Sequence, residues 1–200
     1  MRKQFIQTAV LSLAAIAMVA GLIGWQAPSA NAQGKGGKGK QAPLQTPNPH
    51  YDSVLMEIDV SRPAAEVWAR VGKYCDIGEW LQFPCEITSG TDGKVGVVRS
   101  IGNEVMVAMT PMSYTYAQPV REGVPYDMYH GTLEARPVTA TTSKLVYTLM
   151  WENSRLPDDA ARAQDRERRR TTFTRALENM KILAEGGTLP PRAAGKGKGK

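Results

Sequence analysis

The order in which strand-like and helix-like segments follow one another constrains the fold most strongly. Residues 53–60, SVLMEIDV, alternate apolar and polar side chains, as a half-buried strand does. Further strand-like segments, divided by short turns, fill residues 85–153, and one long helical pattern follows Pro157. Strands that succeed one another through short turns pair with their neighbours, so the sequence predicts a sheet of seven antiparallel strands.

Helix signals stand on both sides of this set of strands. After the first strand, Ser61 is expected to cap a short helix over residues 61–71, and a second helical piece is expected over residues 74–81. The long helix is expected to begin at the N-cap residue Asp158 and to stop at Gly186–Gly187. The fold class is therefore α+β.

The long helix has two unlike halves. Its second half carries an apolar stripe at helical spacing, formed by Phe173, Leu177, Met180, Leu183 and Ala184, and this half is expected to pack on the sheet. Its first half contains the charge run DRERRR over residues 165–170, in which Asp165–Arg169 and Glu167–Arg170 have ion-pair spacing. We interpret this run as a solvated face, with a rim that attracts acidic ligands as the alternative.

The chain opens with a basic, then apolar, then small-residue pattern. Arg2 and Lys3 precede an almost unbroken apolar stretch, and Ala30 and Ala32 flank Asn31 in an A-x-A-like site. This pattern is typical of a secretory signal peptide over residues 1–32, cut after Ala32, and it predicts a periplasmic or secreted protein. An uncleaved membrane anchor is the alternative, because the apolar run approaches spanning length.

Two Gly- and Lys-rich segments flank the expected domain. Residues 33–52 and 187–200 hold too few apolar side chains to offset the entropy of ordering, so we expect a flexible leader and a flexible tail. Residues 44–189 hold 16 Lys/Arg and 19 Asp/Glu, while the other nine basic residues lie outside that range. The folded part is mildly acidic and argues against specific nucleic-acid binding. The tails are suited to weak contact with anionic surfaces.

The chain resembles the SRPBCC superfamily in both element order and local sequence. The matching stretches are V-SRPAAEVWARV, Trp80, G-KVGVVRSIGNEV, SYTYAQ and the strand that ends MWEN. Within that group, which includes START-like lipid carriers and birch-pollen-allergen relatives, the chain is most similar to the polyketide cyclase/dehydrase branch. The resemblance covers roughly Ser53 to Glu185, so the domain is placed at residues 53–186.

The resemblance implies a helix-grip fold, in which a curved antiparallel sheet wraps around the long C-terminal helix and leaves a cavity between them. Such a cavity ordinarily holds an apolar ligand with a few polar groups to orient it. The expected lining residues are Trp80, Arg99, Glu104, Met106, Tyr114, Tyr116, Tyr129, Tyr147, Phe173 and Leu177. For Tyr114 and Tyr116, burial in the core is the favoured interpretation, and for the strand that carries Tyr147 core and lining are equally open.

Few residues offer acid–base chemistry. Glu104 shares a strand face with Met106 and is the weak catalytic candidate, although an exposed carboxylate beside a turn is the favoured interpretation. Arg99 is expected either to reach inward toward an anionic group or to pair with Glu104. His50 falls in the leader, and His130 is expected on the outer face of its strand. The sequence shows no clustered ligand set, so neither a metal nor a cofactor is expected.

Cys75 and Cys85 are the two cysteines of the chain. Export would bring them into an oxidising compartment, where paired cysteines generally form a disulfide. Their spacing is not C-x-x-C, which argues against thioredoxin-like redox chemistry. We expect a staple that holds the helical piece with Trp80 against the sheet, and two buried free thiols are the alternative.

The resulting hypothesis is an exported protein that binds a hydrophobic or amphipathic small molecule or a lipid in an internal cavity. One alternative is a cyclase or dehydratase that acts on an aromatic or polyketide-like substrate. Another is an interaction module tethered to a surface by its basic tails. The cavity is common to the first two, and fold alone does not decide between them.

Overall fold

The computed structural model describes residues 48–120, 124 and 126–191. The expected signal peptide, the leader up to residue 47 and the Gly/Lys segment from residue 192 lie outside the described residues. Within the described part, no helix combines the length and the apolar character needed to cross a membrane.

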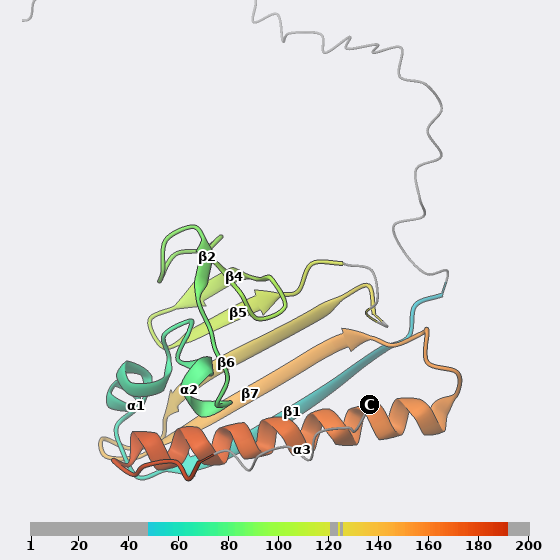
Figure 1. Cartoon of the computed structure of the whole chain (residues 1–200). Coiled ribbons are helices and arrows are strands. Elements are labelled where there is room, and N and C mark those ends of the chain that lie inside the picture. The colour runs from blue at the N-terminus through green and yellow to red at the C-terminus, as the bar shows by residue number, and fades with distance from the viewer. Residues whose placement is uncertain (1–47, 121–123, 125, 192–200) are drawn as a thin grey trace, which may run out of the picture. The chain divides into compact units, whose positions relative to one another are not determined.

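Seven strands form one antiparallel sheet with three helices, as predicted (Figure 1). The spatial strand order is β1-β7-β6-β5-β4-β3-β2, so the strand nearest the N-terminus pairs with the strand nearest the C-terminus and the rest follow as a meander. The elements in chain order are β1 (Tyr51–Val60), α1 (Ala64–Val71), α2 (Ile77–Trp80), β2 (Ile87–Ser89), β3 (Val98–Arg99), β4 (Glu104–Thr110), β5 (Ser113–Ala117), β6 (Tyr129–Pro137), β7 (Ser143–Glu152) and α3 (Asp159–Ala184).

The strand β1 shows the predicted alternation. Val54, Met56 and Val60 are buried, and β1 pairs with β7 along its whole length. It begins at Tyr51, two residues before the expected start of the domain. The early start follows from Asp52, a buried carboxylate that accepts hydrogen bonds from Arg166 of α3 and therefore ties the first residues of the strand to that helix.

The first two helices are shorter than expected. The prediction that Ser61 caps α1 is wrong, because Pro63 occupies the N-cap position without a side-chain hydrogen bond, and the Ser61 amide donates instead to the Glu185 carboxylate. In the second piece only Ile77–Trp80 is α-helical, and the residues before it form hydrogen-bonded turns.

The long helix α3 confirms the predicted cap. The Asp158 side chain accepts a hydrogen bond from the Ala161 amide. The second half of α3 packs through Ala176, Leu177 and Met180, which are fully buried. Figure 1 shows α3 running beside β1, with α1 and α2 next to its C-terminal half. The sheet and α3 therefore form the two layers of a helix-grip fold, as expected.

Candidate functional site

A pocket of about 510 Å³ opens between α2 and the loop after it, the β3–β4 turn, β5 and the middle of α3. Its walls mix aromatic, aliphatic and polar side chains. The lining residues are Ile77, Trp80, Leu81, Gln82, Phe83, Ile101, Glu104, Tyr116, Thr171, Thr172, Phe173, Arg175, Ala176 and Asn179.

The structure distributes the ten expected lining residues over three places. Trp80, Glu104, Tyr116 and Phe173 line this pocket. A second pocket of about 320 Å³, between α1 and the β4–β5 hairpin, has two others in its wall, Met106 and Tyr114. The remaining four are buried beside the first pocket without lining either one, and they are Arg99, Tyr129, Tyr147 and Leu177.

Arg99 and Glu104 form a buried ion pair. The Arg99 Nε atom donates to Glu104 Oε2 at 2.7 Å, and Arg99 Nη2 lies 2.5 Å from the same oxygen. The expectation that Glu104 is exposed beside its turn is wrong, since only 5% of its surface is accessible. The cause is register: Arg99 of β3 lies directly opposite Glu104 of β4, so both side chains point to the inner face, where a charge requires a partner.

Aromatic rings surround the Arg99 guanidinium. Its central carbon lies 4.4 Å from the ring centroid of Tyr74 and 4.6 Å from that of Tyr116, and its Nη1 donates to the Tyr74 carbonyl oxygen at 2.8 Å. Cation–π attraction of this kind strengthens where water is excluded. The Arg99 guanidinium is therefore held by groups of the protein interior. Of the two expectations for this residue, pairing with Glu104 is confirmed.

Two tyrosine hydroxyls meet beside the pocket. The Tyr116 and Tyr147 hydroxyls are 2.9 Å apart, and the Tyr147 ring packs on Phe173 with centroids 4.7 Å apart. Burial raises the pKa of both hydroxyls well above the ordinary value of tyrosine, so both are neutral at physiological pH. The Tyr116 ring fits because Gly131 lies opposite it, where a Cβ atom would stand 2.3 Å from Tyr116 Cζ.

Cys75 and Cys85 are paired in the structure, with Cα atoms 5.4 Å apart. The loop that they close carries α2 and a large part of the pocket wall. The lining residues within it are Ile77, Trp80, Leu81, Gln82 and Phe83. The pair therefore lies at the two ends of the segment that forms this wall of the pocket.

The charge run of α3 is only partly solvated. Arg169 is 7% exposed and ion-paired with Asp165 at 2.8 Å, and its guanidinium lies 4.6 Å from the Trp151 ring centroid and 5.1 Å from that of Tyr129. The interpretation of a wholly solvated face is therefore wrong at Arg169. Sequence spacing found its partner Asp165 but not the rings, which come from β6 and β7.

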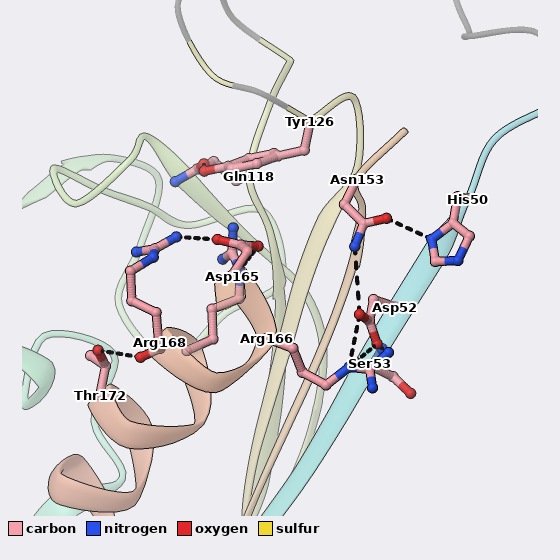
Figure 2. A network of polar contacts seen from close by, with 11 residues as sticks. His50, Asp52, Ser53, Gln118, Tyr126, Asn153, Asp165, Arg166, Arg168 and Thr172 are labelled. Atoms are coloured by element: carbon pink, nitrogen blue, oxygen red, sulfur yellow. Dashed lines mark hydrogen bonds and ion pairs between the residues drawn. The ribbon is translucent and has the colours of Figure 1, made fainter. Parts of the chain in front are cut away.

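A polar network joins the first half of α3 to the start of β1 (Figure 2). Arg166 Nε donates to both Asp52 carboxylate oxygens at 2.8 Å, and Asn153 Nδ2 lies 3.5 Å from Asp52 Oδ2. His50, expected in the leader, is part of this network, because its Nδ1 lies 2.6 Å from Asn153 Oδ1. His130 lies half-buried on the outer strand face, away from the pocket.

Several lining residues were not predicted from the sequence, and most of those discussed next belong to α3. Thr172, Ala176 and Asn179 follow each other at spacings of four and three, so they share a helical stripe next to the apolar one. Small and polar side chains on a helical stripe that faces a sheet indicate a hollow, so these three lining residues could have been predicted from the sequence. Gln82 and Phe83 come from the loop after α2 and have no periodicity that could reveal them.

The described residues contain no group of three or more His, Cys, Asp or Glu placed to hold a metal ion. The chemistry that this pocket offers comes from ring faces, the Tyr116 hydroxyl, the indole N–H of Trp80, the side-chain amides of Gln82 and Asn179, and the charges of Glu104 and Arg175. Such a lining can surround a small apolar body and orient its polar groups.

Solved structures with the same fold include proteins of several kinds. A protein from Thermobifida fusca, solved by NMR, superposes with a TM-score of 0.56 at 20% identity, over 69% of this chain and 97% of its own. The Zhui aromatase/cyclase from Streptomyces sp. R1128 gives 0.55 at 17% identity, over 70% and 100%. Truncated norcoclaurine synthase from Thalictrum flavum gives 0.54 at 12% identity, over 72% and 99%. At these identities the likeness shows the fold alone.

No curated protein matches the sequence significantly. The family model described as polyketide cyclase/dehydrase and lipid transport matches residues 52–185, which span all the described strands and helices except for Tyr51. Together with the helix-grip architecture, this match shows that the chain belongs to the polyketide cyclase/dehydrase and lipid transport family of the SRPBCC superfamily.

Proposed function

We propose that the protein binds a small hydrophobic or amphipathic molecule in the pocket between α2 and α3. The observation that supports this most is the lining, in which Trp80, Phe83, Tyr116 and Phe173 supply ring faces around about 510 Å³ of space. Burying about 300 Å² of apolar ligand surface is worth about 7 kcal/mol before losses, so apolar contact alone can supply a large part of the binding free energy.

The volume limits the size of the ligand. About 510 Å³ lies within the usual range of small-molecule sites. A compound of one to three rings, or one short acyl chain, fits within that space, whereas a two-chain membrane lipid does not. We therefore favour a compact ring compound over a phospholipid.

A matched pair of substitutions on α3 tests the binding site. Thr172 lines the pocket and Thr174 is an exposed neighbour on the same helix that does not. Thr172→Trp should fill the pocket and abolish binding of the neutral probe N-phenyl-1-naphthylamine, while Thr174→Trp should leave binding unchanged. Native mass spectrometry of the purified wild type should in addition reveal a co-purified small compound. Equal probe binding by both variants would place the ligand elsewhere.

Catalysis is the second candidate function, and the burial of Glu104 in the pocket wall favours it. A carboxylate inside an apolar pocket is a suitable general acid or base. The test is to incubate the co-purified compound with ligand-free protein and to analyse its mass afterwards. A new product that Glu104→Gln does not form, at a protein concentration where that variant still binds the compound, would establish an enzyme. An unchanged compound favours a carrier.

We further propose that the protein works outside the cytoplasm, after cleavage behind Ala32, and that Cys75 and Cys85 are oxidised there. The N-terminal sequence pattern and the pairing of the two cysteines support this proposal. The full chain, expressed in a Gram-negative host, should be recovered from the periplasm with the intact mass of a protein that starts at Gln33 and lacks two thiol hydrogens. Recovery of the uncut chain in the membrane fraction would support the anchor alternative.

A further inference from the structure

One arginine of α3 differs from all the others in its surroundings. The helix carries six arginines, and five of them form an ion pair with a carboxylate: Arg162 with Asp159, Arg166 with Asp52, Arg168 and Arg169 with Asp165, and Arg170 with Glu167. The sixth, Arg175, has neither an ion pair nor a hydrogen bond to any described residue, and it lines the pocket. Its positive charge is therefore available to bind a negatively charged group of a ligand.

The two charged groups of the pocket lie at different depths. Arg175 is exposed, whereas Glu104 is buried and already held by Arg99. A negatively charged group would be attracted by Arg175 at the mouth, whereas at depth the ion pair of Glu104 with Arg99 leaves no uncompensated cation to hold it. The positive charge of the pocket is therefore at its mouth, and the pocket favours a ligand whose apolar body lies inside and whose acidic group lies at the mouth.

The indole of Trp80 adds a second unused group. Trp80 is 0% exposed, and its Nε1 has no hydrogen-bond partner among the residues that the structure describes. A buried donor without an acceptor is costly, and an indole N–H can only donate. Because the Nε1 atom is itself inaccessible, an acceptor oxygen would satisfy it only after the side chains around the indole had shifted.

We propose that the ligand of this pocket is a small ring-containing carboxylic acid, whose carboxylate binds Arg175 at the mouth while its ring lies against Trp80 and Phe173. This inference rests on the proposed binding function and names the chemical class of its ligand. It also distinguishes the pocket from one that selects neutral lipids or amines.

The experiment compares two probes of nearly the same shape, naphthalene-2-carboxylic acid and naphthalene-2-carboxamide, by calorimetry at neutral pH and low salt. The acid should bind wild type about tenfold more tightly than the amide, because a hydrogen-bonded charge pair is worth about that factor at an accessible site. Arg175→Ala should remove this preference, so that the acid and the amide bind that variant with similar affinity, and Arg175→Lys should retain part of it. Arg170→Ala is the matched control, since Arg170 is an exposed, ion-paired arginine of the same helix outside the pocket.

The outcomes separate this inference from the function on which it rests. If acid and amide bind wild type equally, or if the preference survives in Arg175→Ala, the acidic ligand is ruled out and small-molecule binding stands. If neither naphthalene binds but neutral N-phenyl-1-naphthylamine does, the same conclusion follows. If none of the three probes binds ligand-free wild type, the proposed binding function itself fails.

Discussion

At the scale of single residues, the ion pair of Arg99 and Glu104 governs the interior next to the pocket. Both side chains are almost inaccessible, and each is the other's ionic partner. A buried pair of this kind contributes little relative to an apolar pair of the same volume, but the loss of one partner leaves an uncompensated charge. Glu104 is therefore a structural residue whether or not it also acts on a ligand.

Comparison of a single and a double substitution tests this role. Glu104→Gln should lower the free energy of unfolding by about 3–5 kcal/mol, because the Arg99 charge stays buried without its carboxylate. The double variant Arg99→Met, Glu104→Leu should be less destabilised than Glu104→Gln alone. Urea denaturation of the three proteins measures both effects. A double variant that is less stable than Glu104→Gln would contradict a buried pair.

Gly131 is a second residue on which the pocket wall depends. Gly131→Ala should cost about 1–3 kcal/mol, because the new Cβ would overlap the Tyr116 ring and separate the Tyr116 and Tyr147 hydroxyls. The neighbouring substitution His130→Ala, on the outer face of the same strand, should change stability by less than about 0.5 kcal/mol. Thermal denaturation of both variants, together with near-UV circular dichroism of the tyrosines, provides the measurement. A stable Gly131→Ala protein with an unchanged tyrosine spectrum would be the opposite result.

At the scale of elements, the α2 loop and the middle of α3 form opposite walls of the pocket with different supports. The α3 wall belongs to a long helix fixed by its cap and by its buried stripe. The α2 wall is a single helical turn, too short to be stable alone, and is held by Cys75–Cys85 and by the hydrogen bond from Asn179 to the Trp80 carbonyl.

Loss of the cysteine pair should therefore loosen one wall of the pocket. Cys75→Ser with Cys85→Ser is expected to lower the free energy of unfolding by about 3 kcal/mol in the chain-entropy account. The same variant should release a bound probe faster than wild type, since five lining residues lie within the freed loop. Stopped-flow dissociation and urea denaturation measure the two effects. An unchanged dissociation rate would show that the loop is held by packing alone.

At the scale of the whole molecule, buried phenols dominate the interior between sheet and helix. Tyr74, Tyr114, Tyr116, Tyr129 and Tyr147 all have pKa values raised by burial, and that of Tyr129 is raised from 10.0 to about 12. Since the raised pKa reflects a preference of the folded state for the neutral hydroxyl, this contribution to stability is complete below about pH 10 and is lost as the pH rises through the folded values.

An alkaline titration checks this directly. The tyrosine contribution to the free energy of unfolding should stay constant up to about pH 10 and then fall steeply toward pH 12. Phenolate absorbance should rise over the same pH range in which the circular dichroism signal is lost. Tyr129→Phe should reduce the steepness of the fall. Complete phenolate formation near pH 10 in a protein that remains folded would contradict the buried cluster.

The amino-acid sequence alone determined the order of strands and helices, because alternation, turn residues and helix signals are local, while the helix-grip arrangement was expected from the family resemblance. The strand segments, the Asp158 cap and the outward face of His130 needed no knowledge of distant neighbours. The Ser61 cap failed since a helix start also depends on what else the backbone amide can reach, here the Glu185 carboxylate far along the chain.

The candidate site was decided by the tertiary structure. The sequence identified Arg99, Glu104, Tyr116 and Trp80, but strand register buried the first two as a pair, and Gly131 on the next strand left room for the Tyr116 ring. Which residues border open space depends on how α3 packs across the sheet, and a one-residue shift in any pairing would change the list. Alternation along a strand depends on residues that are neighbours in the sequence, whereas a cavity is the space left between segments that meet only after folding.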